Sequence, residues 1–213
     1  MNPIISACAE NLHLPLCARQ IDLLERYAGL VWQKKETLNL TSVADMQEIF
    51  TRHICDGLQA AAYIYSRTGN TPAQVADAGS GAGYIGITCA VALPDCTVTL
   101  VESLQRRCAF LNWAVMMLGL KNVKVANKRL GQGGNFSFDF LTERAMGKLT
   151  DMLPLCAPAV APGGLFIAYQ GEQPDELPSA MLAKCAVQAL PLTPYSLGDG
   201  KKRFLAVFKK ENK

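Results

Sequence analysis

The chain has 213 residues, of which 50% are hydrophobic and 18% are charged, and its formal net charge is +3. This length provides for one sizeable buried core, and this composition excludes a disordered chain. No apolar run approaches the ~20 residues needed to span a bilayer. The first sixteen residues also lack the basic cluster and apolar stretch of a signal peptide. We therefore expect a soluble, cytoplasmic protein with no membrane partner.

Eight cysteines and two histidines are present, but the cysteines include no Cys-x-x-Cys pair and no cluster of ligands stands out. No metal site is therefore predicted. The cysteines are interpreted as buried free thiols in a reducing compartment. The small net charge does not by itself indicate a nucleic-acid partner. Basic residues do gather near the C-terminus, where they predict a basic face or only a solvated tail: Lys201, Lys202, Arg203, Lys209, Lys210 and Lys213.

The first third of the chain has a helical pattern. Apolar residues recur at intervals of three and four, which predicts one helix over about 17–35. A second helix is predicted to begin after Asp45, because Glu48 stands three residues later in the spacing of a capping box. A polar turn over 39–42 separates the two helices. Residues 1–72 are thus predicted to form a helical extension packed on the core that follows.

After Pro72 strands alternate with helices. Strands linked by helices indicate a parallel sheet with right-handed crossovers. The last two strands have no helix between them and are expected to form a hairpin, which makes one strand antiparallel. The core over 73–213 is therefore predicted to be α/β, with a mostly parallel sheet of seven strands at 73–78, 97–101, 123–126, 138–142, 165–169, 187–192 and 204–208.

A glycine loop, Asp77-Ala-Gly79-Ser-Gly81-Ala-Gly83, directly follows the first predicted strand and opens a helix. Doubly wound sheets bind nucleotides at this position. Gly81, Gly83 and Gly86 also satisfy the spacing of a dinucleotide site. However, the Asp77 carboxylate would repel a pyrophosphate, whereas it would favour the cationic methionine portion of S-adenosylmethionine. The sequence therefore favours a methyl donor over NAD, and a tight turn without a ligand is the less favoured alternative.

Glu102 ends the second predicted strand, where its carboxylate can accept hydrogen bonds from both ribose hydroxyls. The alternative is an exposed charge at a strand end. The terminal hairpin is independent support for a methyl donor, because class I methyltransferases characteristically end their sheet with an antiparallel strand. The predicted fold is therefore a Rossmann-like class I methyltransferase that depends on S-adenosylmethionine.

Several segments, in order, resemble the bacterial small-subunit (16S) rRNA guanine-N7 methyltransferases, the RsmG or GidB family. Each is weak alone, but the ordered set is specific and matches from about Leu24 to Lys210. Arg144 and Arg203 look like further family positions. The segments are Asn39-Leu-Thr-Ser-Val, Arg52-His-Ile-Cys-Asp56, the glycine loop, Glu102-Ser-Leu, Arg106-Arg107 and Phe110-Leu111.

The resemblance implies transfer of a methyl group from S-adenosylmethionine to N7 of a guanine, in a small-subunit rRNA loop near the decoding centre. The family usually has an acidic residue where Gly131 stands and a lysine where Gln170 stands. The loss of that lysine bears on RNA or cofactor affinity. The resemblance implies cofactor contacts at Gly79, Tyr84, Leu130, Gly131 and Arg144. These add to the contacts already predicted at Asp77, Gly81, Gly83 and Glu102.

Guanine N7 has a lone pair and no proton, so no acid or base is required and alignment with the methyl carbon suffices. If a general acid or base does act, the candidates are His53 and Asp56. The Asp56 carboxylate would also relieve positive charge that develops on the purine. His53 either contacts RNA or fills the helical region. The RNA contacts predicted from these family positions are Asn39, Arg52, His53 and Arg203.

The expected partner is small-subunit rRNA or an assembling 30S subunit, and the expected oligomeric state is a monomer. Two alternatives stay open at this point. One is an S-adenosylmethionine-dependent methyltransferase for another RNA or a small molecule. The other is a non-catalytic RNA-binding factor in ribosome assembly.

Overall fold

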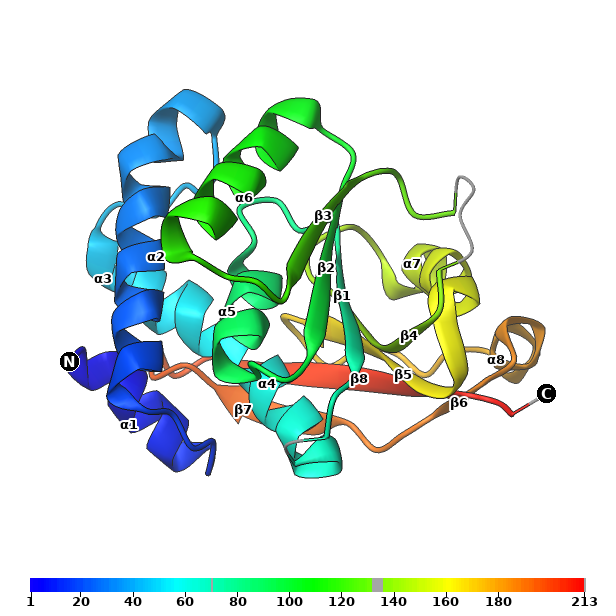
Figure 1. Ribbon diagram of the computed structural model, residues 1–213. Helices are drawn as coiled ribbons and strands as arrows, with labels where there is room; N and C mark the ends of the chain where they lie inside the picture. The colour runs from blue at the N-terminus through cyan, green and yellow to red at the C-terminus, as the bar shows by residue number, and fades with distance from the viewer. Residues whose placement is uncertain (70, 132–135, 213) are drawn as a thin grey trace.

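A central sheet with helices on both faces forms the fold in the computed structural model, which describes residues 1–69, 71–131 and 136–212 (Figure 1). The strands are β1 (Gln74–Ala78), β2 (Thr97–Glu102), β3 (Val123–Asn127), β4 (Phe138–Glu143), β5 (Val160–Gln170), β6 (Val187–Ala189), β7 (Thr193–Ser196) and β8 (Lys202–Lys210). The helices are α1 (Pro3–Asn11), α2 (Ala18–Leu38), α3 (Met46–Glu48), α4 (Cys55–Thr68), α5 (Tyr84–Ala92), α6 (Gln105–Leu118), α7 (Leu149–Cys156) and α8 (Ser179–Cys185).

The sheet runs in the order β3-β2-β1-β4-β5-β8-β6, with β7 also paired to β8. Strands β1 to β5 are parallel, and β8 runs antiparallel to β5. The predicted α/β class with one reversed strand is confirmed. The order reverses between β1 and β4, and ligands bind at the carboxyl ends of strands at such a point.

The sheet has eight strands where the sequence predicts seven, because two short strands share one edge position. β6 pairs with the last residues of β8, and β7 pairs with its first residues. The single strand predicted over 187–192 is therefore wrong in extent. Pro191 lies between the two strands, and it has no amide hydrogen for the ladder.

The N-terminal helices pack on the same face of the sheet as α5 and α6 (Figure 1). The helix predicted over 17–35 is confirmed as α2, which buries Leu24 and Tyr27 completely. α5 is buried along its whole length because it lies between the sheet and the N-terminal helices. α7 and α8 cover the other face.

Two helices were not predicted, α1 and α8, and both are short. α1 begins at Pro3, and the Asn2 side chain caps it by accepting hydrogen bonds from the amides of Ile4 and Ile5. This end uses two standard N-terminal signals, a capping Asn and a Pro in the first turn. None of the helices in the described part of the chain has the length and apolar character of a membrane span.

The predicted helix start at Asp45 is confirmed, since its carboxylate accepts a hydrogen bond from the amide of Glu48 at 2.8 Å. The return bond of a capping box is shifted by one residue, because Glu48 accepts from the amide of Ala44. Between α3 and α4 the chain forms a π-helical segment, Ile49–Ile54. Such segments are frequently found at functional sites, and this one carries Arg52 and His53.

Candidate functional site

The glycine loop lies at the carboxyl end of β1, as predicted. Gly79 and Gly83 have φ of 61° and 89°, in the left-handed region that glycine occupies without strain. A Cβ atom at position 79 would lie 2.6 Å from the sulfur of Met146. α2 supports the loop from the far side, because the Tyr27 hydroxyl donates a hydrogen bond to the carbonyl of Ala82 at 2.8 Å. The loop is thus held between the sheet and the N-terminal extension.

Two cavities flank this loop. The larger, of about 720 Å³, lies beside the carboxyl ends of β1, β2 and β3, and its walls include Gly79, Glu102, Leu130 and Gly131. The smaller, of about 300 Å³, lies between the loop and the 40–42 segment. The remaining predicted cofactor residues, Asp77, Gly81, Tyr84 and Arg144, line the smaller cavity, whereas Gly83 packs toward Leu111.

Glu102 organises the loop in a way that the sequence did not indicate. One carboxylate oxygen accepts a hydrogen bond from the amide of Gly81 at 2.9 Å, and the other accepts from the amide of Leu104 at 2.8 Å. Arg107 lies 3.8 Å away and adds a favourable charge. Each carboxylate oxygen keeps a second lone pair. Glu102 therefore holds the protein backbone and retains acceptor capacity toward the larger cavity.

Asp77 is 2% exposed, and its carboxylate accepts hydrogen bonds from the amide of Gly86 at 3.0 Å and the hydroxyl of Thr142 at 3.1 Å. Burial raises the pKa of Asp77 to about 6. The packing around Asp77 also requires glycine at position 86, because a Cβ atom there would lie 2.9 Å from the Cβ of Asp77 and would clash with Leu100. The third glycine of the dinucleotide-like spacing thus allows close contact between helix and strand.

Asp56, on α4, does not stand free beside a substrate. One of its oxygens accepts from the Arg144 guanidinium at 2.7 Å, and the other accepts from the Tyr195 hydroxyl at 2.6 Å. It is not among the described residues that line either cavity. The carboxylate expected beside the purine is instead engaged with Arg144, and it orients that side chain.

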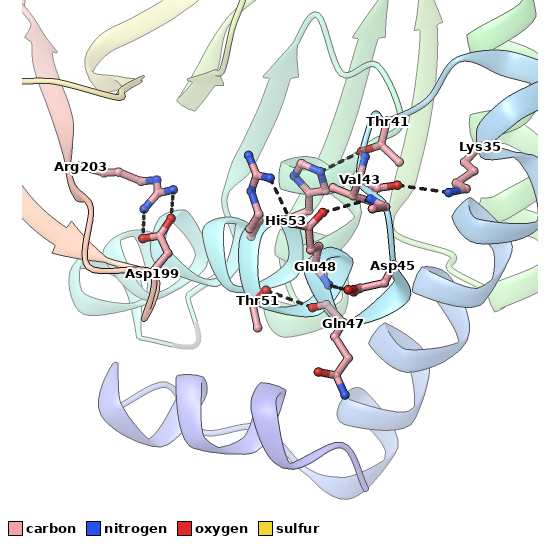
Figure 2. A network of polar contacts seen from close by, with 12 residues as sticks. Lys35, Thr41, Val43, Asp45, Gln47, Glu48, Thr51, His53, Asp199 and Arg203 are labelled. Atoms are coloured by element: carbon pink, nitrogen blue, oxygen red, sulfur yellow. Dashed lines mark hydrogen bonds and ion pairs between the residues drawn. The ribbon is translucent and has the colours of Figure 1, made fainter.

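His53 is stacked on Tyr84, with ring centroids 4.0 Å apart and an interplanar angle of 19°. Its Nε2 lies 3.1 Å from the hydroxyl of Thr41, and the two face each other in Figure 2. Its Nδ1 is buried and has no hydrogen-bond partner within the described residues. Burial, with the cations Arg144 and Arg52, lowers the pKa of His53 to about 3. His53 is therefore a neutral group at physiological pH.

The predicted RNA-binding residues have different surroundings. Asn39 is exposed and ends α2 in the left-handed conformation, with φ of 49°. Arg52 is half exposed and lies 3.5 Å from Glu48. Arg203 is engaged by both oxygens of Asp199 at 2.8 and 2.7 Å, and this pair lies apart from His53 in Figure 2. Arg203 is thus paired with Asp199 within the protein, and its contact with RNA stays a prediction.

The predicted C-terminal basic face is also divided. Lys202 and Lys210 lie at opposite ends of β8, ~26 Å apart at the rise of an extended strand. Only the end with Lys201 and Lys202 lies at the carboxyl edge of β5, where the site is. The Lys210 ammonium donates to the carbonyl of Cys185 at 2.7 Å. Lys213 lies outside the described residues.

Two residues of the site were missed as functional groups. Tyr195 has no motif around it, and only the tertiary fold brings it to Asp56. Arg107 stands in a family segment but without an assigned role. It lines both cavities, and its Nε is buried without a hydrogen-bond partner in the described part of the chain.

Solved structures with a similar fold are methyltransferases. The magnesium protoporphyrin IX methyltransferase of Synechocystis PCC 6803 with bound S-adenosylmethionine aligns with a TM-score of 0.62 at 13% identity, over 92% of this chain and 99% of that one. A SAM-dependent methyltransferase from Aquifex aeolicus aligns with a TM-score of 0.56 at 16% identity, over 76% of this chain and 92% of that one. The fold is thus that of the Rossmann-like methyltransferases.

Sequence comparison narrows this class. A family model described as rRNA small subunit methyltransferase G, GidB, matches residues 20–204. Proteins named ribosomal RNA small subunit methyltransferase G are 35% identical in Sorangium cellulosum, over 81% of this chain and 71% of the relative, and 32% identical in Leptothrix cholodnii, over 79% and 78%. The chain belongs to this family, and the resemblance drawn from the motifs is confirmed.

Proposed function

We propose that the protein transfers a methyl group from S-adenosylmethionine to N7 of a guanine in small-subunit rRNA near the decoding centre. Family membership supports the rRNA substrate. The surroundings of the two candidate bases, His53 and Asp56, support N7 as the acceptor atom. His53, with a pKa lowered to about 3, is a poor proton acceptor, and both oxygens of Asp56 are engaged. An acceptor atom without a proton suits such a site.

The residues present fit the cofactor. The larger cavity is of the size that holds a nucleoside-sized ligand, and Leu130, Met152 and Leu155 offer an apolar wall for an adenine ring. Glu102 has free lone pairs for ribose hydroxyls. When bound, S-adenosylmethionine supplies a methyl group on a sulfonium. The Asp77 carboxylate lines the smaller cavity, and the two arginines that also line it, Arg107 and Arg144, lie 3.8 and 2.7 Å from the carboxylates of Glu102 and Asp56.

The protein's own contribution to the reaction is orientation. Arg144 is held by Asp56, and His53 is held by Thr41 and Tyr84, so contacts within the protein fix these side chains on the walls of the smaller cavity. Alignment of two reactants in a preformed site lowers the barrier without proton transfer. We assign Gly79, Gly81, Tyr84 and the other cofactor residues that line the two cavities to this arrangement, and Gly83 to the packing of the loop against Leu111.

We further propose that the protein works as a monomer in the cytoplasm, on naked rRNA or an assembling 30S subunit. Residues 1–72 are proposed to be an extension of one structural domain. Ile5 and Leu24 share a core cluster with Val75 and Ile87 of the sheet and α5, which supports a single cooperative unit.

The test is to map methylated guanines in small-subunit rRNA from a deletion strain, its parent and a complemented strain. N7-methylguanosine is cleaved by aniline after borohydride reduction, so the parent and complemented strains are expected to show one cleavage that the deletion strain lacks. Methylation that resists this cleavage would assign another acceptor atom. Identical rRNA in all three strains, together with S-adenosylhomocysteine binding by the pure protein, would favour a non-catalytic assembly factor.

A further inference from the structure

The two cavities beside the glycine loop are parts of one cleft. Gly79, Arg107 and Ala145 contribute to the walls of both, so these three residues mark the junction. Gly79 has no side chain there, so its backbone contributes to both walls while the side chain of Met146 packs against it. A ligand that fills the larger cavity can therefore present an atom to the smaller one across this point.

The walls of the two cavities differ in chemistry. The larger has an apolar rim, with Leu104, Met146 and Leu155 partly exposed. The smaller has a polar end that shares no residue with the larger, formed by Thr41, Ser42 and His53. An adenine ring matches the apolar walls, and a group with several hydrogen-bonding edges matches the polar end.

We propose that the polar end of the smaller cavity, formed by Thr41, Ser42 and the His53–Tyr84 stack, is the pocket for the acceptor purine. This inference rests on the proposed function and adds the place where the target base is held. The hydroxyls of Thr41 and Ser42 can donate to or accept from a base edge, and the partly exposed His53 ring, backed by the buried Tyr84, is an aromatic surface of the kind on which nucleobases stack. The His53 ring is neutral and the Arg144 guanidinium in the same cavity is paired with Asp56, so neither is an unopposed cation beside a purine that gains positive charge.

The smaller cavity, of about 300 Å³, also has cofactor residues in its walls, so its polar end has room for one nucleobase at most and not for a base pair. The target nucleotide must therefore leave its stack before it enters. This cost is lowest for an unpaired or loop nucleotide. Two exposed cations can contact flanking phosphates: Arg52 directly precedes His53 on the π-helical segment, and Lys202 begins β8 at the carboxyl edge of β5.

Two exposed serines separate the proposed roles of the cavities. Ser42 lines only the smaller cavity, and Ser103 lines only the larger one. Ser42→Trp is expected to leave the calorimetric affinity for S-adenosylhomocysteine within about twofold, and to lower methyl transfer to rRNA by about 100-fold or more, since misplacement of a reactant costs that much. Ser103→Trp is expected to lower the same affinity by about tenfold or more. Ser66→Trp, on an exposed face of α4, is the control.

A binding readout independent of catalysis uses rRNA fragments with 6-thioguanosine at the target position. Ultraviolet cross-linking is expected to attach the base to the tryptic peptides 36–52 or 53–67, and Ser42→Trp is expected to abolish these adducts. Adducts confined to other peptides, or wild-type methylation by Ser42→Trp, would overturn the acceptor pocket while the proposed function stands. A wild-type protein that binds S-adenosylhomocysteine but neither cross-links nor methylates rRNA would overturn the proposed function itself.

Discussion

Tyr195 donates a hydrogen bond of 2.6 Å to Asp56, from a position 139 residues later in the chain. The other oxygen of Asp56 binds Arg144 at 2.7 Å. The Arg144 guanidinium in turn lies 5.5 Å from the centre of the Tyr84 ring, on which His53 is stacked. The edge strand β7 is thereby connected to the wall of the smaller cavity through polar side chains, of which Asp56 is buried and Tyr195 and Arg144 are partly buried.

Tyr195→Phe removes only the hydroxyl that Asp56 accepts from. The remaining carboxylate oxygen is buried without a donor, so we expect the free energy of unfolding to fall by about 1–3 kcal/mol. Urea denaturation measures this loss. Tyr63→Phe is the matched control, because its hydroxyl meets Arg67 on an exposed helix face, and a change within about 0.5 kcal/mol is expected there. Equal losses in the two variants would show that the hydrogen bond to Asp56 contributes no more to stability than the exposed contact of Tyr63.

Glu102→Gln keeps the size of the side chain but replaces one acceptor oxygen with an NH2 group. That group cannot accept from the amide of Gly81 or Leu104, and the charge-assisted bonds become neutral ones. We expect the affinity for S-adenosylhomocysteine to fall by about tenfold or more. Isothermal titration calorimetry checks this, with the partly exposed Glu48→Gln as control. An unchanged affinity would remove Glu102 from the cofactor site.

Gly79→Ala tests the space at the cavity junction. Both Gly79 and Gly119 have left-handed φ, of 61° and 65°, so alanine at either is expected to cost about 1–2 kcal/mol of stability. Only at position 79 does the new Cβ meet Met146, whereas no described atom lies within 4 Å of one at position 119. Loss of S-adenosylhomocysteine affinity in Gly79→Ala but not in Gly119→Ala is the expected result. Parallel losses would indicate backbone strain alone.

The pH dependence of stability reports the state of His53. Its pKa is lowered to about 3, from an ordinary value of 6.5, so between these values the unfolded chain binds the proton and the folded chain does not. Its contribution is present above pH 6.5 and is lost as pH falls toward 3, with a limiting slope of about 1.4 kcal/mol per pH unit. Asp77, with a pKa raised to about 6, acts in the opposite sense between 3.8 and 6.

The substitution His53→Gln removes the contribution of His53 to the pH dependence of stability and leaves that of Asp77. The difference in unfolding free energy, wild type minus His53→Gln, is expected to rise as pH increases from about 4 to 6.5 and to stay constant above that value. Urea denaturation over this range measures it. A difference that does not vary with pH would mean that His53 titrates normally in the folded protein.

RNA affinity is expected to depend on one end of β8. Replacing Lys201 and Lys202 with Gln should weaken rRNA binding and reduce the slope of log K against log salt by about 0.7 for each phosphate that the variant no longer neutralises. Replacing Lys184 and Lys209, which lie at exposed positions away from the carboxyl edge, should change neither. Filter-binding titrations at several salt concentrations measure both. Similar losses in the two double variants would indicate a diffuse effect of net charge.

The sequence by itself determined the features that depend on local patterns. The strand and helix order, the glycine loop after β1, the helix start at Asp45 and the family all follow from periodicity, turn chemistry and motifs within short stretches of chain. These signals are local because a helix or strand exposes its buried face at a fixed spacing. Short elements carry less of that signal, which is why α1, α8 and the division of the edge strand at Pro191 were missed.

Tertiary structure alone decided which side chains meet. Arg144 reaches Asp56 across 88 residues, and Tyr195 reaches the same carboxylate across 139, because the sheet order places β4, α4 and β7 around one point. Two other outcomes are local. Lys202 and Lys210 lie apart because they are at opposite ends of one extended strand, and Arg203 pairs with Asp199 four residues earlier. The partners of Asp56 depend on distances through the fold, and no spacing along the chain encodes those distances.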